Sequence, residues 1–344
     1  MSSCRSFALF SRLGSVGQIY NGDEPHRFQL TLEPALRQTF PFSYPPSYLF
    51  PIWPLSFLSY GAAYLVWDGV TLALFLWSVF GTRVRAMLFW FVLPAATTMI
   101  TLIQGQNGLL TSALVVGGTR VMRAQPVLGG VLLGLATIKP RLGILVQLAL
   151  LAAGYWRTLA DACVTAISLV IASGAICGWA LWVEWVDGLS SHAAYLDVSV
   201  GNYLKPGIMA NLVLFGVAAP AAHAIQGCVG LVVAAIVFLC FWRGATDPSI
   251  AALQAGTFLA MPYVFRYDMP MLANAILLMA RDRRGSGETV NVIEAVVLFL
   301  GLMAPAITTV TTRFFYVSGL SLPLLFGLAV WWRLRPLTDR RSRT

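Results

Sequence analysis

The sequence is poor in charge, because only 11% of its 344 residues are Asp, Glu, Lys or Arg, while 58% are hydrophobic. A soluble domain of this size carries about a quarter charged residues, so this chain has too few to cover a water-facing surface. It also lacks the alternation of apolar and polar residues that marks a membrane β-barrel. Inside a bilayer the backbone must satisfy its own hydrogen bonds, and helices remain as the way to do so.

Residues that bind metals or form disulfides are few and scattered. No pair of cysteines has the spacing of metal ligands, and the histidines are dispersed along the chain. We therefore expect no metal site and no cofactor. Most of the cysteines lie in or beside apolar runs and are interpreted as small buried hydrophobic residues. These residues are Cys4, Cys163, Cys177, Cys228, Cys240, His26, His192 and His223.

The charge that is present is mostly positive, with a formal net charge of +9. The arginines stand between apolar runs and do not gather on one face, which argues against a nucleic-acid partner. They are instead typical of residues that fix membrane topology. The basic tail Arg333–Arg343 is expected to hold the end of the last helix at an anionic cytoplasmic leaflet.

Eleven apolar runs follow one another along the chain. Several are shorter than the roughly 20 residues of a perpendicular span, so we expect these to be tilted, buried or open to a cavity. The prediction is an all-α, polytopic transmembrane helical bundle of about 11 membrane segments, several of them short. The runs are Gly61–Phe80, Ala86–Ile103, Gly108–Gly118, Val127–Ile138, Leu142–Tyr155, Ala160–Val183, Ala224–Trp242, Ile250–Val264, Met269–Ala280, Asn291–Val310 and Phe314–Trp332.

Alternate loops between these runs differ in Arg and Lys content, with fourteen in one set and five in the other. The richer set should be cytoplasmic, which predicts a multi-pass protein of the cell membrane with a cytoplasmic C-terminus. Residues 1–46 then form an extracytoplasmic segment, 47–332 the transmembrane domain, and 333–344 the basic cytoplasmic tail. No strong hydrophobic span precedes Tyr44, so either the chain inserts with its N-terminus outside or it lacks an upstream helix.

Lys139 and Arg141 are two cations with almost no polar flank between short predicted helices. Charges at that depth are costly unless they pair or line a wet cavity. One interpretation is a clamp for the phosphate of an anionic lipid. The other is that both side chains extend to the outer interface to reach water.

Polar residues also gather in the other loops of the predicted outer face. Gln104, Gln106 and Asn107 form an amide cluster that can donate to and accept from sugar hydroxyls; taken alone, a tight Asn-Gly turn is the favoured explanation. Tyr44 lies in a turn made rigid by prolines, where it either supports a sugar or sets the angle of chain entry. Asp68 is an unusual acid within an apolar run.

Arg266 and Asp268 flank Tyr267 at the start of a short predicted helix. We expect Asp268 to cap the N-terminus of that helix. The alternative is an ion pair that organises a pocket, for which Arg266 is the more interesting member.

In order along the chain, five blocks resemble glycosyltransferase family 87. Its members are polyprenol-phosphate-mannose-dependent α-1,2-mannosyltransferases and relatives with the GT-C fold. The resemblance runs from about Tyr20 to the end, and its most specific parts are Gly-Gln-Asn-Gly and Leu-Ala-Thr-Ile-Lys-Pro. The blocks are Phe42-Ser43-Tyr44-Pro45-Pro46, Gly105-Gln106-Asn107-Gly108-Leu109-Leu110, Gly129-Gly130-Val131-Leu132-Leu133-Gly134-Leu135-Ala136 running into Lys139-Pro140, Pro262-Tyr263 and Tyr267-Asp268.

The resemblance implies transfer of a hexose, with mannose expected, from a polyprenyl-phosphate sugar to a hydroxyl of a glycan or glycolipid. The step is a single inverting displacement on the extracytoplasmic face, in a protein surrounded by membrane lipids. It needs an acid to take the acceptor proton and cations for the leaving phosphate; Lys139 fits the second role, with Arg141, Lys205 or Arg266 assisting. The predicted substrate-binding residues are Tyr44, Gln104, Gln106, Asn107, Lys139, Arg141, Lys205, Arg266, Tyr267 and Asp268.

One feature of the family is missing. Its members usually carry a first transmembrane helix and then an outer loop with the catalytic Asp, whereas this chain resembles them only from beyond that Asp. The catalytic residue is therefore unassigned, with Asp23 and Glu24 as weak candidates. The alternatives are a lipid or lipid-linked-sugar transporter or flippase, against which the lack of an internal repeat counts, and a catalytically inactive, truncated family member.

Overall fold

The structure is a computed structural model, and it describes residues 3–13, 16–21, 23–32, 42–81, 92–93, 95–198, 207–311 and 317–335. It is 83% helical, and no strand occurs in the described residues. The longest helices are α4 (Tyr60–Phe80), α10 (Trp156–Cys177), α11 (Ala180–Val198), α13 (Ala219–Trp242) and α16 (Val292–Thr311).

The remaining α-helices are shorter. They are α1 (Ser3–Leu13), α2 (Asp23–Leu32), α3 (Leu49–Ile52), α6 (Ala96–Gln104), α7 (Gly108–Val121), α8 (Pro126–Leu135), α9 (Pro140–Ala152), α12 (Ile208–Leu214), α14 (Asp247–Ala260), α15 (Met271–Gly285) and α17 (Ser318–Leu334). Short 3-10 turns connect several of them: η1 (Val16–Gln18), η2 (Pro46–Tyr48), η3 (Trp53–Phe57), η4 (Ala136–Ile138) and η6 (Arg266–Asp268).

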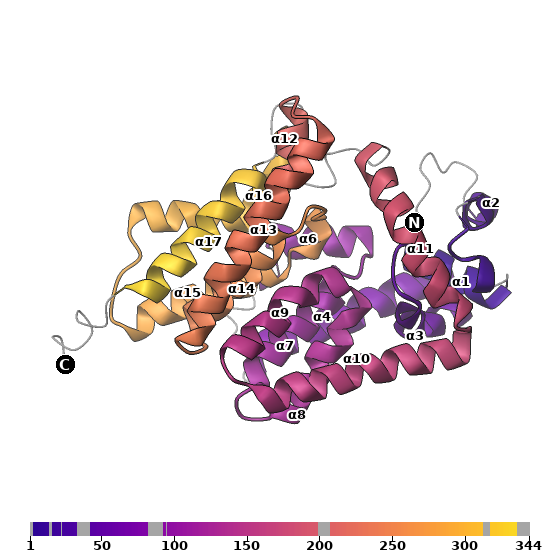
Figure 1. The fold of residues 1–344 in the computed structure, drawn as a ribbon, viewed down its shortest axis with the longest axis horizontal. Coiled ribbons are helices and arrows are strands. Elements are labelled where there is room, and N and C mark those ends of the chain that lie inside the picture. The colour runs from indigo at the N-terminus through magenta and orange to yellow at the C-terminus, as the bar shows by residue number, and fades with distance from the viewer. Residues whose placement is uncertain are drawn as a thin grey trace.

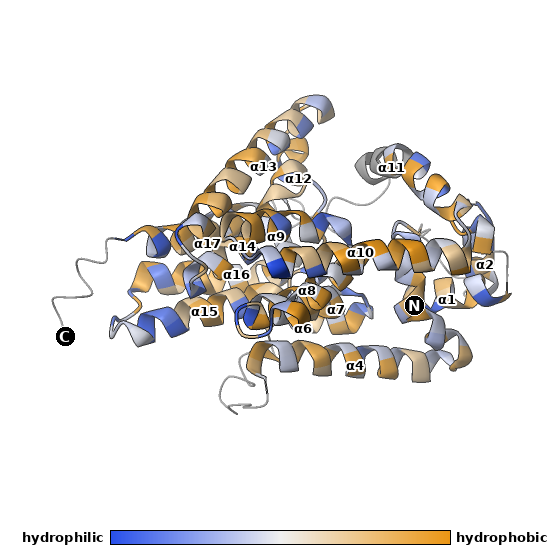
Figure 2. Cartoon of the chain, turned by 60° about the horizontal axis from the view of Figure 1, so that its bottom comes forward, coloured by the Kyte–Doolittle hydropathy of each residue, from blue (hydrophilic) through white to orange (hydrophobic). Residues whose placement is uncertain are grey.

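Three described helices, α4, α10 and α13, are long and apolar enough to cross a membrane. Figure 2 shows α4 and α10 apolar along most of their length. Shorter apolar helices of 10–17 residues accompany them. The predicted all-helical fold is confirmed and includes three membrane-capable helices, while the count of about 11 segments stays a prediction.

The predicted run Ala160–Val183 is not one continuous helix. The chain breaks at Gly178, whose φ of 101° is a backbone conformation that favours glycine. Helix α10 therefore ends at Cys177, and α11 begins at Ala180. Much of the loop expected after residue 183 is helical as part of α11. Parts of two other predicted runs, residues 86–91 and 314–316, lie outside the described residues.

Close packing between helices depends on glycines of α8. Gly130 and Gly134 face α10 so closely that a Cβ atom at either position would collide with it. Small residues permit such approach in membrane proteins, where packing rather than water expulsion drives association. Helix α8 consequently lies between α7 and α10, as the packing of these three helices shows.

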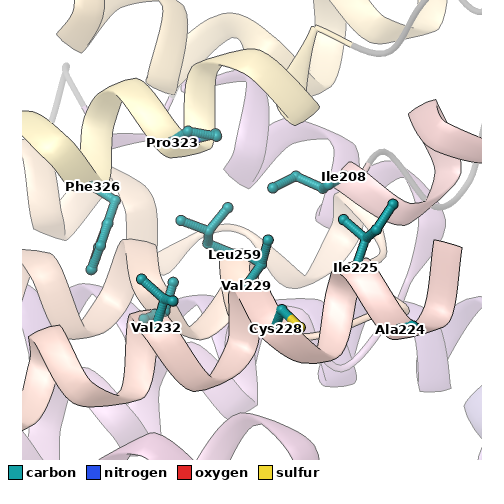
Figure 3. A pocket seen from close by; sticks show the side chains of 10 residues that line it. Ile208, Ala224, Ile225, Cys228, Val229, Val232, Leu259, Pro323 and Phe326 are labelled. Atoms are coloured by element: carbon teal, nitrogen blue, oxygen red, sulfur yellow. The ribbon is translucent and has the colours of Figure 1, made fainter. Parts of the chain in front are cut away.

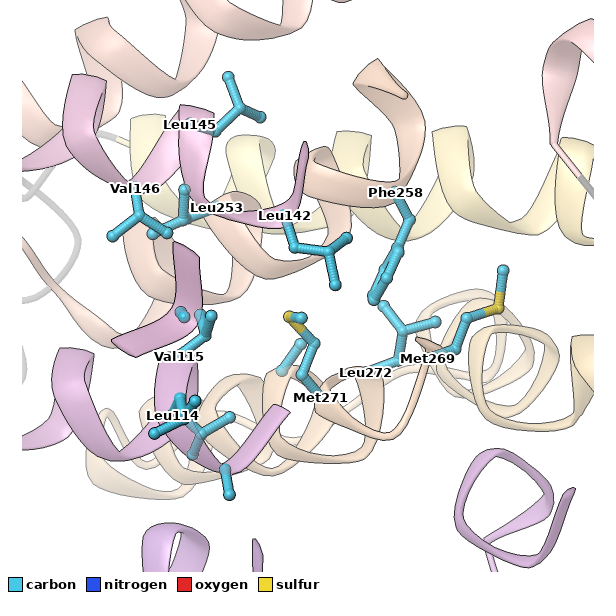
Figure 4. Packing of buried hydrophobic residues seen from close by; sticks show 14 of the residues in the cluster. Leu114, Val115, Leu142, Leu145, Val146, Leu253, Phe258, Met269, Met271 and Leu272 are labelled. Atoms are coloured by element: carbon cyan, nitrogen blue, oxygen red, sulfur yellow. The ribbon is translucent and has the colours of Figure 1, made fainter. Parts of the chain in front are cut away.

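The core that supports the candidate site is built by α7, α9, α14 and α15. Figure 4 shows Val115, Leu142, Leu253 and Met271 from these helices packed toward one another. The N-terminal helices α1–α3 lie at one end of the molecule and α15 and α17 toward the other (Figure 1). This core fixes where α7, α9 and α15 begin, and the polar residues gather at those beginnings.

A cationic cluster at the starts of three helices

Three helices begin next to the same group of polar residues. Helix α7 starts after Asn107, α9 starts after Lys139, and α15 starts three residues after Asp268. Among the described residues, no side chain caps the first N–H groups of α7 or α9, whereas the N–H of Met271 at the start of α15 donates to Oγ of Ser112 at 3.2 Å. Uncapped N–H groups at a helix start give that end a partial positive charge.

Lys139 lies at the centre of this cluster and is only 2% exposed. Its Nζ atom donates to Oδ1 of Asn107 at 3.0 Å and forms an ion pair with Asp268, which is 1% exposed. The rings of Tyr44 and Tyr267 also face the ammonium group, with their centroids 5.6 and 5.2 Å from Nζ. A carboxylate, an amide oxygen and two aromatic faces therefore stabilise this buried charge.

Arg141 pairs with the other oxygen of the same carboxylate, at 3.2 Å from Asp268 Oδ2. Its guanidinium also donates to the carbonyl oxygen of Tyr263 at 3.1 Å and lies 5.0 Å from the ring centroid of Phe265. Unlike Lys139, its side chain is 28% exposed. Arg141 is thus the edge of the cluster that an incoming anion meets first.

Gly108 is required by a close approach of two backbones. A Cβ atom at this position would collide with the carbonyl oxygen of Tyr267. The same carbonyl accepts a hydrogen bond of 2.8 Å from the hydroxyl of Thr101 on α6. The Gly-Gln-Asn-Gly block therefore presents Asn107 to Lys139 and also lets η6 lie against the start of α7.

A wall of aromatic residues borders the cluster on the N-terminal side. The ring centroids of Tyr44 and Tyr48 lie 4.3 Å apart, and the Tyr48 hydroxyl is 3.2 Å from the thiol of Cys4 on α1. The hydroxyl of Tyr20 donates to the Tyr44 carbonyl at 2.7 Å. The proline turn thus places Tyr44 beside Lys139, and α1 packs behind Tyr48.

Burial shifts the pKa values of the lysine and the two tyrosines of the cluster. It lowers the pKa of Lys139 to about 8, although the attraction of Asp268 acts in the opposite direction. It raises the pKa of Tyr44 and of Tyr267 well above the ordinary value, so both phenols are neutral at physiological pH. The cluster therefore combines two basic side chains with one carboxyl group, and the uncapped starts of α7 and α9 add positive potential.

The other predicted substrate-binding residues lie beside this cluster or outside the residues that the structure describes. Gln104 ends α6 and Gln106 precedes Asn107, and both are half-buried. Arg266 is buried within η6. Lys205 lies outside the described residues. The prediction that Asp268 caps a helix is wrong, because the residue at the cap of α15 is Pro270 and two cations occupy the carboxylate.

The weak candidates for a catalytic acid are not part of the cluster. Asp23 is exposed, and Glu24 pairs with Arg27 at 3.5 Å on α2. Helix α2 lies apart from α9 in both Figure 1 and Figure 2. Asp68 is buried on α4, with its Oδ1 atom unpaired in the described part of the chain.

Sequence reasoning missed Cys4, Tyr48 and Phe265. A signal existed for Tyr48 and Phe265, because each lies within a few residues of a tyrosine that was selected. Nothing local pointed to Cys4, whose contact with Tyr48 joins residues 44 positions apart. Among the described residues, no three His, Cys, Asp or Glu side chains lie together as a metal site.

The fold and this cluster define a helical membrane protein with a buried site suited to an anion. The sequence profile of glycosyltransferase family 87 matches residues 42–264, which is well over half of the chain and includes most of the cluster. The chain belongs to glycosyltransferase family 87. A search of curated proteins and a search of solved structures each gave no match.

Proposed function

We propose that this protein transfers a hexose, with mannose as the expected sugar, from a polyprenyl-phosphate sugar to a hydroxyl of a glycan or glycolipid. Membership of family 87 supports sugar transfer by a membrane protein. The observation that carries the donor assignment is the meeting of Lys139, Arg141 and Asp268 beside the uncapped starts of α7 and α9. That arrangement leaves one positive charge in excess, and helix starts attract phosphate groups.

The proposed step is a single displacement at C1 of the sugar. The acceptor oxygen forms a bond to C1 while the bond from C1 to the phosphate oxygen breaks, so the configuration at C1 inverts. The electron pair of the broken bond stays on the polyprenyl phosphate, and an acidic side chain takes the acceptor proton. Charge grows on the phosphate as the bond breaks, and cations already fixed beside it lower that barrier.

The residues of the cluster have different roles in this proposal. Arg141, the exposed member, contacts the phosphate first, and Lys139 supplies a fixed positive charge behind it. Asp268 holds both cations in position. Tyr44 and Tyr267 offer aromatic faces to the sugar.

Several assignments rest on chemistry and position alone. Gln104 and Gln106 are proposed to contact sugar hydroxyls, and Arg266 and Lys205 to assist with the phosphate. Asp23 and Glu24 remain weak candidates for the proton acceptor.

We further propose that the cluster lies on the extracytoplasmic side of the cell membrane and the C-terminus in the cytoplasm. The arginine-bearing ends of α15 and α17 support this, because in the described residues they contact the neighbouring ends of α13 and α14. Arg333 donates to the carbonyl of Arg243 at 2.5 Å, and Arg281 pairs with Asp247 at 2.6 Å. Residues 1–46 would then be extracytoplasmic, 47–332 the membrane domain and 333–344 the cytoplasmic tail.

A transfer assay tests the function. Membranes containing the protein receive polyprenyl-phosphate mannose labelled in the sugar, and a parallel sample receives the same sugar on a nucleotide. The proposal predicts label in the acceptor fraction, with release of polyprenyl phosphate, from the lipid donor only. Passage of the intact donor between leaflets without transfer would instead favour a flippase, and neither activity would favour an inactive family member.

A further inference from the structure

An apolar groove of about 610 Å³ runs along one side of α13. Figure 3 shows side chains of α12, α13, α14 and α17 pointing into it. Its volume lies within the roughly 300–1,000 Å³ of sites that bind small molecules. Its lining includes Ile208, Ala224, Cys228, Val232, Leu259 and Phe326.

One end of the groove adjoins the cationic cluster. Leu259 is in the last turn of α14, and the loop after that helix carries Tyr263, whose carbonyl oxygen accepts the hydrogen bond from Arg141. The hydroxyl of Tyr263 lies 3.5 Å from Nε2 of His223, the residue before Ala224 on α13. A continuous path of contacts thus leads from the exposed guanidinium to the mouth of the groove.

The groove extends away from the cluster along the helix axis. Its lining on α13 runs from Ala224 to Val233, which at 1.5 Å per residue is about 13 Å. Ile225 and Val232 in this lining are exposed at the surface of the described structure. In a membrane that surface faces lipid, so a chain can enter the groove sideways from the bilayer.

We propose that this groove holds the first isoprenoid units of the donor lipid while Arg141 and Lys139 hold its phosphate. The inference rests on the proposed function. A polyprenyl phosphate carries its phosphate directly on the hydrocarbon chain, which matches a cationic cluster immediately beside an apolar groove. A phospholipid has a glycerol and ester linkages between phosphate and chain, so it fits this short separation less well.

The groove selects the chain by packing and by the attached phosphate. Removal from water contributes little, because the surrounding lipid tails are as apolar as the groove itself. Branched side chains such as Ile208 and Val232 complement the methyl branches of an isoprenoid chain. Simple lipophilicity is therefore insufficient for binding, and a long-chain phospholipid should compete weakly.

Cys228 provides a reporter inside the groove of the unmodified protein. It is an exposed free thiol, and Cys163 on α10 is a second exposed thiol outside the groove. The full chain in detergent–lipid micelles is labelled with a membrane-soluble maleimide, with and without undecaprenyl phosphate. We expect the lipid to slow labelling of Cys228 at least fivefold and to leave Cys163 unchanged, whereas phosphatidylglycerol at the same mole fraction has no such effect.

Two variants on the same helix sharpen the test. Ala224→Trp fills the mouth of the groove, whereas Leu231→Trp places the same ring on a surface position that is 74% exposed and outside the lining. Ala224→Trp should abolish protection of Cys228 by undecaprenyl phosphate, and Leu231→Trp should keep it within twofold of the unmodified protein. Equal protection by phosphatidylglycerol, or none by undecaprenyl phosphate, would overturn the groove assignment.

The labelling result is independent of catalysis. Sugar transfer by a protein whose Cys228 is never protected would reject the groove and leave the proposed function intact. Protection of Cys228 in a protein that transfers no sugar would reject the proposed function and leave a polyprenyl-phosphate site in place.

Discussion

The protein contains two buried ion-pair clusters that resemble each other and differ in charge balance. One joins Lys139 and Arg141 to Asp268. The other joins Arg283 of α15 to Glu294 at the start of α16. Each has a cation over an aromatic ring, since Arg283 lies 4.1 Å from the ring centroid of Trp332 just as Lys139 lies near Tyr267.

The Arg283 cluster is balanced in charge. Arg283 also contacts Glu288, which Arg335 reaches at 3.2 Å, so two cations meet two carboxylates. Glu294 further accepts from Nε1 of Trp332 at 2.9 Å. These residues join α15, α16 and α17, and their charges sum to zero.

The Lys139 cluster is cation-rich and has an open edge at Arg141. A buried binding site thus differs from a buried structural ion pair in two respects: it has unmatched charge, and a ligand can reach it. Substitutions in and around the two clusters test that distinction.

Loss of Arg283 should have the largest effect, and it should be on stability. Arg283→Ala leaves Glu294 buried without its cation, and breaking a buried pair in this way costs about 3–5 kcal/mol. Thermal unfolding in detergent measures it. The matched control is Arg281→Ala, whose ion pair with Asp247 is 73% exposed on the arginine side and contributes at most about 1 kcal/mol. Equal unfolding temperatures for the two variants would contradict a structural role.

Loss of Lys139 should lower the rate of sugar transfer. Lys139→Ala removes the fixed positive charge behind the phosphate and should lower the transfer rate about 100-fold, the size of effect expected from one preorganised electrostatic group. Initial rates with labelled polyprenyl-phosphate mannose, at equal amounts of folded protein, give the comparison. Lys139→Arg retains the charge and should recover part of the rate. A Lys139→Ala variant as active as the unmodified protein would remove this residue from the site.

Gly108→Ala tests whether the cluster depends on the close backbone approach. The added Cβ collides with the Tyr267 carbonyl, so η6 must move and carry Asp268 with it. A shift of about 1 Å can cost up to about 100-fold in rate, and we expect at least about tenfold here. Gly143→Ala on α9 meets no atom within 4 Å and is the control. Identical transfer rates for both variants would show that the approach is unimportant.

Transfer should fall as pH rises through about 8. Burial lowers the pKa of Lys139 to that value, so the amine loses its proton and its charge above it. The Lys139→Arg variant keeps its charge because a guanidinium does not deprotonate in this range. Rates measured across this pH interval should decline for the unmodified protein and stay level for the variant. A decline of the same shape in both proteins would assign the titration to another group.

The smallest effect concerns the weak acid candidates. Asp23→Asn and Glu24→Gln change residues that lie on α2, outside the cluster, so each should leave the transfer rate within about twofold. The assay is the same as for Lys139. A loss comparable to that of Lys139→Ala would instead make that acid the proton acceptor and require α2 to approach the cluster.

Much of the fold was predictable because the hydropathy of a local segment is enough to locate a membrane helix. The starts of α7 and α9 coincide with predicted boundaries within two residues, since Asn-Gly and Lys-Pro both interrupt a helix. The break at Gly178 was missed because no polar residue marks it. Apolar composition alone cannot distinguish one long helix from two shorter ones that meet at a glycine.

The candidate site was only partly predictable. Asn107, Lys139 and Asp268 could each be selected from a local block, but their pairing spans up to 129 positions and no single block encodes it. Asp268 was misinterpreted because the capping rule is local, whereas the attraction of two cations from α9 is a tertiary effect. The contact of Cys4 with Tyr48 depends on how α1 packs, which nothing in its own residues specifies.

We propose above all that the cluster of Lys139, Arg141 and Asp268 binds the phosphate of a polyprenyl lipid. The most direct test compares the affinity of the purified full chain for undecaprenyl phosphate with that for undecaprenol, which has the same chain without the charge. We expect at least tenfold tighter binding of undecaprenyl phosphate, and loss of that preference in Lys139→Ala but not in Arg281→Ala. Equal affinity of the unmodified protein for both lipids would contradict it.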